Sequence, residues 1–169
     1  ERLTVFSDGW TLEAAEEICS DEKLESYEIL DLLSNLVDKS IVIVKESGEE
    51  NRFNMLKTLR QYGSEKLNIS EDKYIIQKKH FDVYSRFMNN AEQNLGGADQ
   101  KEWVSKYDSE IDNIRESLKW AAGNDPEAAL RLALNAANYW DTKYYYTEAV
   151  EFLDSILNKE YSYDKKFYA

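Results

Sequence analysis

The stretch that decides the fold is "ILDLLSNLVDKSIVIVKESGEENRFNML", which runs from Ile29 to Leu56. An apolar helical pattern leads into the β-branched run Ile41–Val44, which is typical of a strand. The polar "ESGEEN" has the composition of a turn, and "RFNML" returns as a second strand. A helix followed by a hairpin predicts a winged helix with a short two-stranded wing. Many winged helices bind DNA, so the chemistry of this surface matters for function.

The flanking segments complete such a domain over residues 1–70. Thr11 is placed to cap a helix through "WTLEAAEEIC", in which Cys19 is expected in the core. The helix before the wing carries an apolar stripe of Ile29, Leu32, Leu33, Leu36 and Val37. The segment after the wing, "MLKTLRQYGSEKL", predicts an amphipathic helix whose apolar face consists of Leu56, Leu59, Tyr62 and Leu67.

From Ser70 onward the pattern is helical throughout. One long helix should bury Phe81, Tyr84, Met88, Ala91 and Leu95, and Gly96–Gly97 should end it. Asp99 and Glu102 have the spacing of a capping box for the next helix. That helix has a seven-residue apolar rhythm, in Trp103, Tyr107, Ile111, Ile114, Leu118 and Ala121. Asp125 and Pro126 then begin another helix as its N-cap and first residue.

The last forty residues predict a pair of helices similar to a tetratricopeptide repeat. The small and large residues of such a repeat fall at Ala133, Ala136, Ala137 and Trp140, then at Ala149 and Leu153. No second copy lies 34 residues away, so either more repeats follow Ala169 or this is an ordinary helical hairpin. We therefore predict a mainly α fold: a winged helix over 1–70, a helical arm over 71–125, and a tetratricopeptide-like array beginning at 126–169.

Composition favours a folded cytoplasmic protein without affinity for membranes or nucleic acid. The 169 residues are 43% hydrophobic and carry a net charge of −12, which repels phosphate and lipid headgroups. A single cysteine cannot form an internal disulfide, which fits a reducing compartment. No apolar run approaches the roughly 20 residues that cross a bilayer. Because Glu1 leads directly into an apparently structured segment, we expect a piece of a longer protein.

The sequence holds no recognisable catalytic, metal or nucleotide site. The one histidine, His80, lies in an amphipathic helix and is expected to be structural or on the surface. None of the six glycines precedes a lysine, so no phosphate-binding loop is present. The carboxylates are spread over the polar faces of helices, without metal-ligand spacing. We therefore predict no enzyme activity, and neither a cofactor nor a metal in this chain.

The winged helix itself is acidic where DNA-binding relatives are basic. Outside its stripe, the helix before the wing offers Glu28, Asp31, Ser34, Asn35 and Asp38. Residues 1–70 hold 15 acidic and 8 basic side chains, a balance of −7, and three carboxylates lie in the wing turn. Because DNA affinity depends on neutralising phosphates, this surface favours contact with protein. The alternative is a DNA-binding winged-helix domain of a transcription factor.

Five segments in this order resemble one bacterial family. They are "RLTVFSDGWTLEAAEEIC", "ILDLLSNLVDKSIV", "RFNMLKTLRQYGSEKL", "KKHFDVYSRF" and "LGGADQKEWVSKYDSEIDNIRESLKWA". Together, over about residues 2–158, they resemble the part that follows the NB-ARC ATPase core in STAND-class transcriptional regulators of the AfsR or LuxR type. The resemblance implies a winged helix that latches the upstream ATPase domain, helical repeats that receive a protein or small-molecule inducer, and ATP or ADP bound elsewhere in the parent protein.

One departure from the family concerns the nucleotide. Eukaryotic relatives place Met-His-Asp after the wing, and the histidine contacts ADP, whereas this chain has Met55, Leu56 and Lys57. Leucine cannot donate a hydrogen bond. Lys57 or Arg60 could approach the phosphates of a docked ATPase domain, or both could simply be solvated.

The C-terminal helix pair is the expected partner surface. The possible partner surface consists of Trp140, Tyr144, Tyr145 and Tyr146. The three tyrosines could line the groove that a sensor would use, or they could pack in the core and be only partly exposed. In the last helix, Phe152, Leu153, Ile156 and Leu157 span too much of the circumference to face one neighbour. We therefore expect weak self-association through residues beyond about Trp140, or a tail without order from Tyr161.

Overall fold

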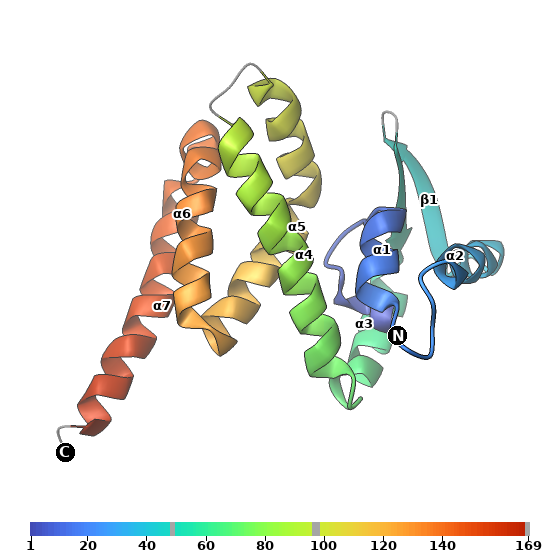
Figure 1. Cartoon of the computed structure of the whole chain (residues 1–169), viewed down its shortest axis with the longest axis horizontal. Coiled ribbons are helices and arrows are strands. Elements are labelled where there is room, and N and C mark those ends of the chain that lie inside the picture. Colours follow the sequence, from blue (N-terminus) through green and yellow to red (C-terminus); the bar gives the residue numbers. More distant parts are fainter. Residues whose placement is uncertain (48–49, 96–98, 168–169) are drawn as a thin grey trace. The chain divides into compact units, whose positions relative to one another are not determined.

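Helices make up most of the described chain, and one antiparallel hairpin lies among them in the first half (Figure 1). The computed structural model describes the backbone of residues 1–47, 50–95 and 99–167, and the side chains of residues 1–45, 51–95 and 99–157. The chain divides into two compact units, Glu1–Val83 and Tyr84–Ala169. The predicted mainly α class, a winged helix followed by helical repeats, is confirmed. The predicted domain boundaries at 70 and 125 stay a prediction.

The first unit contains the winged helix. Its elements are the 3-10 turn η1 (Arg2–Val5), α1 (Leu12–Cys19), α2 (Glu28–Asp38), β1 (Val42–Ser47), β2 (Glu50–Met55), α3 (Lys57–Asn68) and the first part of α4 (Lys73–Asn94). Thr11 caps α1 as predicted, because its hydroxyl accepts a hydrogen bond from the Ala14 amide at 3.2 Å. The helix α2 ends at Asp38, and two residues later the left-handed φ of 56° at Ser40 turns the chain toward β1.

The wing is the two-stranded antiparallel hairpin that the sequence predicted, and an isolated bridge from Trp10 is added to it. In the antiparallel register of β1 and β2, Val42 pairs with Met55 and Val44 with Phe53. On its other edge, Phe53 exchanges two backbone hydrogen bonds with Trp10, at 2.8 and 2.9 Å. The segment before α1 therefore protects the free edge of β2. Gly9 permits this approach, since a Cβ there would lie 3.1 Å from the Phe53 carbonyl oxygen.

Aromatic residues fill the centre of the first unit. The rings of Phe6 and Trp10 stack at 5.1 Å, and the buried ring of His80 meets Phe6 edge-on at 5.7 Å. His80 is thus structural, as expected. Cys19 is buried, as predicted, among the core residues Val5, Ala15, Ile18, Leu33, Val42 and Leu67.

Two predicted apolar faces are only partly covered within this unit. In α2, Ile29 and Leu33 are buried but Leu32 is 45% exposed. In α3, the predicted face is confirmed only at Leu67, which is buried. Its other members, Leu56, Leu59 and Tyr62, are exposed, and Gly63 is buried instead. The reason is the close approach of η1, where Thr4 packs directly on Gly63.

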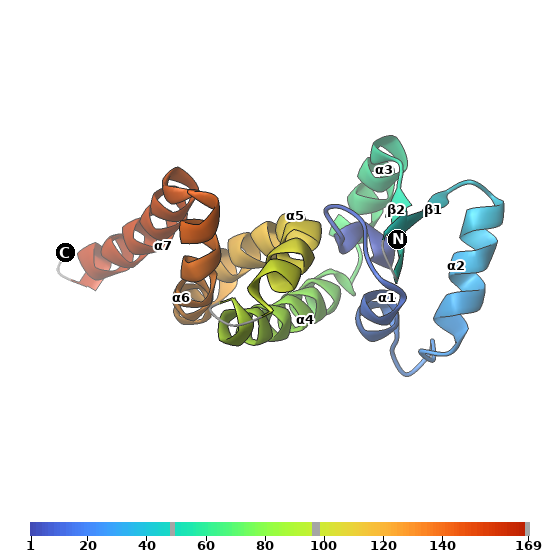
Figure 2. The same ribbon diagram turned by 90° about the horizontal axis from the view of Figure 1, so that it is seen from above.

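The second unit is a bundle formed by the end of α4 and three further helices, α5 (Gln100–Asn124), α6 (Pro126–Lys143) and α7 (Tyr146–Phe167). Figures 1 and 2 show α6 and α7 side by side as a helical hairpin. The predicted stripe of α4 is confirmed, because Phe81, Tyr84, Met88, Ala91 and Leu95 are all buried. Tyr107 of α5 stacks on Tyr139 of α6 at 3.8 Å.

The helix ends of the second unit agree only in part with the sequence. Asp125 caps α6 through the Ala128 amide, and Pro126 occupies its first turn, as predicted. The predicted capping box at Asp99 was wrong, because its side chain makes no cap hydrogen bond. Asp99 has a near-helical ψ of 12°, which differs from the extended backbone usual at a cap. The predicted break at Gly96–Gly97 and the tail side chains from Tyr161 lie outside the described residues.

Candidate interaction surfaces

The outward face of α2 combines carboxylates with an exposed leucine. Leu30 is 46% exposed and lies beside the exposed Asp31, whereas Leu32, 45% exposed, lines the cavity described below. The two polar side chains that could contact bases are bonded to their own helix, since Ser34 Oγ donates to the Leu30 carbonyl and Asn35 Nδ2 to that of Asp31. No lysine or arginine lies within α2. The wing-turn carboxylates fall on side chains outside the described part.

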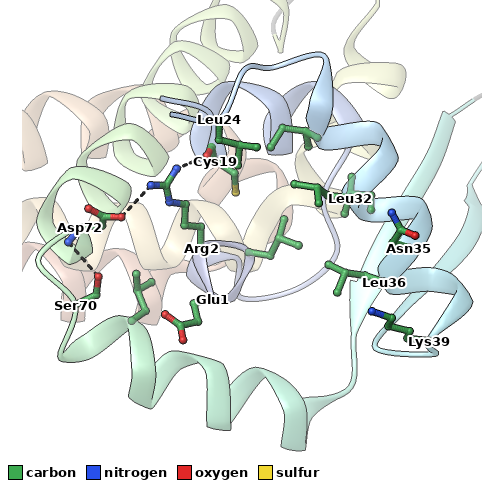
Figure 3. A pocket seen from close by; sticks show the side chains of 14 residues that line it. Glu1, Arg2, Cys19, Leu24, Leu32, Asn35, Leu36, Lys39, Ser70 and Asp72 are labelled. Atoms are coloured by element: carbon green, nitrogen blue, oxygen red, sulfur yellow. Dashed lines mark hydrogen bonds and ion pairs between the residues drawn. The ribbon is translucent and has the colours of Figure 1, made fainter. Parts of the chain in front are cut away.

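A largely apolar cavity of about 460 Å³ lies under α2, wholly within the first unit (Figure 3). Leu32 and Leu36 reach it from α2, and Leu67 closes it from α3. The cavity explains why the α2 stripe is incompletely buried: part of the stripe faces open space. Its remaining walls are formed by Glu1, Arg2, Leu3, Cys19, Leu24, Ile29, Leu33, Asn35, Lys39, Ser70 and Asp72.

Arg2 fixes one wall of this cavity (Figure 3). Its guanidinium donates to the Cys19 carbonyl at 2.7 Å and pairs with Asp21 at 2.5 Å and Asp72 at 2.9 Å. The hydrogen bond from Arg2 lowers the pKa of Asp21 to about 2. Arg2 thereby joins η1, the end of α1 and the start of α4. No local sequence pattern predicts this cluster, because Asp21 and Asp72 lie 19 and 70 residues from Arg2 along the chain.

Lys57 and Arg60, the two basic residues predicted to approach a nucleotide, have different environments. Lys57 is exposed at the start of α3. Arg60 is half-buried, and its Nη1 donates to the Phe6 carbonyl at 3.3 Å. Arg60 therefore ties α3 to the segment before α1, while Lys57 stays available to a docked partner. A role for either one near a nucleotide stays a prediction.

Of the four aromatic residues predicted as a partner surface at the α6–α7 turn, the three tyrosines are exposed and the tryptophan is buried. That the tyrosines receive a partner stays a prediction. Trp140 is only 5% exposed, because it packs on Phe152 of α7 and its Nε1 donates to Glu148 at 3.3 Å. Its assignment to a partner surface was therefore wrong. Tyr144, Tyr145 and Tyr146 are exposed at the turn. In α7, Ile156 is buried and Leu157 is exposed, which agrees with the prediction that the apolar residues of this helix cannot all face one neighbour.

The described part of the chain was also compared with the requirements of a metal site and of a membrane span. Within residues 1–47, 50–95 and 99–167, no three histidine, cysteine or acidic side chains are grouped as a metal site would need. In the same part of the chain, no helix has both the length and the apolar character to cross a membrane.

Comparison with known proteins links the chain to transcriptional regulators. It is 29% identical over 163 residues to proteins of Mycobacterium tuberculosis and Mycobacterium bovis that are each named "Putative HTH-type transcriptional regulator". The alignment covers 94% of this chain but 18% of each relative, so the chain spans about a fifth of their length. An uncharacterised protein of M. tuberculosis is 37% identical over 70 residues, 41% of this chain. No family model and no solved structure matches the chain.

Proposed function

We propose that this chain is a non-catalytic regulatory segment of a STAND-class, NB-ARC-type transcriptional regulator. In this proposal the first unit latches the ATPase domain that precedes it, and the second unit is the root of a tetratricopeptide-like sensor. Adenine nucleotide is bound by the parent protein, and an inducer acts on the repeats. The similarity to part of much longer regulators supports the regulatory role, and the family resemblance of the segments in order supports the ATPase context.

The observation that carries the proposal is the outward face of α2. A winged helix that binds DNA presents arginine, lysine, asparagine or glutamine from this position. Here Leu30 and Asp31 are exposed, and Ser34 and Asn35 each donate a hydrogen bond to a carbonyl of their own helix. An exposed leucine beside a carboxylate suits a protein partner better than a phosphate backbone.

The alternative, DNA binding by this winged helix, is favoured by the name of the mycobacterial relatives. The chain matches only 18% of those proteins, so the helix-turn-helix to which the name refers can lie in the remainder. In the proposed architecture, DNA binding belongs to such a separate domain.

A mobility-shift titration of the 169-residue chain with mixed-sequence duplex DNA tests the proposal that this winged helix contacts protein and not DNA. We expect no complex at micromolar protein and physiological salt, and no calorimetric binding of ATP or ADP tighter than about 0.1 mM. Salt-dependent DNA binding that Lys39→Ala or Lys45→Ala abolishes would favour the alternative. The ATPase context is tested separately by the gene, which should encode a phosphate-binding loop upstream of Glu1.

A further inference from the structure

The α6–α7 turn contains two arrangements of tyrosine beside a carboxylate, and only one of them holds a cation. In the first, the Arg115 guanidinium lies 5.9 Å from the centre of the Tyr145 ring. Glu148 binds the same guanidinium with both oxygens, at 2.6 Å to Nη2 and 3.1 Å to Nε. An aromatic face and a carboxylate together are a favourable site for an arginine.

The second arrangement has the same parts without a cation. Tyr144 and Tyr146 form an edge-to-face pair with ring centres 6.2 Å apart. The Tyr146 hydroxyl donates to Asp141 Oδ1 at 2.9 Å, which holds the carboxylate beside the rings. Tyr144 is 79% exposed and Tyr146 is 53% exposed. Among the described side chains, Asp141 forms no ion pair, in contrast to Glu148.

Two of these residues are locally unfavourable for the fold. Tyr144 has a left-handed φ of 59° in a Schellman turn, in which Tyr145 N binds Trp140 O and Tyr144 N binds Asp141 O. Glycine is the usual residue at this position, because a side chain strains it. Asp141 lies in the last turn of α6, where the helix dipole disfavours a negative charge. Strain and misplaced charge that packing does not explain indicate a functional constraint.

We propose that Asp141, Tyr144 and Tyr146 form a docking site for an arginine side chain of a basic segment in a partner protein. The Arg115 site within the same turn shows the geometry: the planar guanidinium lies against a tyrosine ring while its N–H groups reach a carboxylate. Arginine suits this arrangement better than lysine, because only its planar fork combines stacking with two parallel hydrogen bonds. The net charge of −12 on the chain adds long-range attraction for a basic partner. The site is independent of whether the winged helix binds DNA.

The test is a titration of the 169-residue chain with the peptide acetyl-Gly-Arg-Ser-Arg-Gly-amide, followed by NMR of labelled tyrosine rings. We expect saturable shifts at Tyr144 and Tyr146, and binding at least threefold weaker in Asp141→Asn and in Tyr144→Gly. Both changes remove an unfavourable feature, so the melting temperature should be unchanged or raised. Weaker peptide binding at an unchanged or raised melting temperature would show that the variant has lost the binding site and not the fold.

Matched controls are Asp154→Asn and Tyr27→Leu, which alter an exposed carboxylate and an exposed tyrosine away from the turn. Both should bind like the unaltered chain, and a peptide with citrulline in place of arginine should give no shift. The proposal is overturned if no saturable shift occurs, or if Asp154→Asn weakens binding as much as Asp141→Asn. Equal binding of a lysine peptide, or of tetramethylammonium, would overturn the assignment to arginine.

Discussion

At the scale of single residues, Arg2 and its partners should make stability depend on acid pH. The hydrogen bond from Arg2 lowers the pKa of Asp21 from 3.8 to about 2. Because the pKa of Asp21 is lower in the folded than in the unfolded chain, ionised Asp21 stabilises the fold at pH values above its unfolded pKa. This stabilisation is lost as the pH falls toward 2. Asp21→Asn should therefore lower the urea midpoint at pH 6 but hardly at pH 2. The exposed neighbour Glu22→Gln is the control, and equal effects of Asp21→Asn at both pH values would contradict the assignment.

Cys19 allows a second test at this scale. Burial raises the pKa of its thiol to about 12, so almost no thiolate exists at pH 8 and the sulfur is covered. Iodoacetamide should label the native chain at least about 100-fold more slowly than the chain in urea. Because Cys19 is the single cysteine, the intact mass reports this one site. Rapid labelling under native conditions would show that the wall of the cavity opens.

At the scale of elements, Gly63 shows what holds α3 against η1. A Cβ at Gly63 would lie 2.5 Å from Thr4 Cγ2, and Thr4 is itself buried. Gly63→Ala should therefore destabilise the chain by about 1–3 kcal/mol through overpacking, despite the roughly 1 kcal/mol gain in helix propensity. Adding Thr4→Ser removes the clashing methyl group and keeps the hydroxyl that donates to the Glu1 carbonyl. Chemical denaturation should show recovery in the double variant.

Gly123 provides the matched control for this prediction. It also lies in a helix, α5, but a Cβ there would meet nothing within 4 Å. Gly123→Ala should stabilise the chain by about 0.5–1 kcal/mol. If Gly63→Ala is as stabilising as Gly123→Ala, the contact between α3 and η1 is looser than the structure shows.

The same elements show how far sequence patterns reach. The stripe of α4 was predicted correctly, because Phe81, Tyr84, Met88 and Ala91 repeat over a long amphipathic helix. The faces of α2 and α3 were predicted only in part, because periodicity identifies an apolar face but does not show which element covers it. Leu32 lines a cavity, and Leu59 is 37% exposed. At the candidate sites, three adjacent tyrosines pointed to the α6–α7 turn, but their exposure could not be deduced from the sequence. The Arg2 cluster depends on partners 19 and 70 residues away. Trp140 was placed both at a packing position of the repeat and on the partner surface, and its contacts with Glu148 and Phe152 of α7 decide for packing.

At the scale of the whole molecule, the outer side of α7 should cause weak self-association. Val150 and Leu157 are exposed, and the half-buried Leu153 lies between them. The spacings of three and four residues place all three on one stripe, which is the pattern of a helix–helix contact. A second copy of the chain can cover this stripe, as a further helical repeat would.

Sedimentation velocity between about 10 µM and 1 mM protein tests this contact, a range in which weak helix–helix associations of this kind are observable. The sedimentation coefficient should rise with concentration in the unaltered chain and stay constant in Leu157→Glu. Leu157 is a better probe than Phe152, whose ring packs 6.0 Å from Trp140, so that a charge there would disturb the bundle itself. Ile69→Glu introduces the same charge at an exposed apolar position in the first unit and should associate normally. If the unaltered chain is monomeric throughout, or if Ile69→Glu also abolishes association, the stripe on α7 is not the contact.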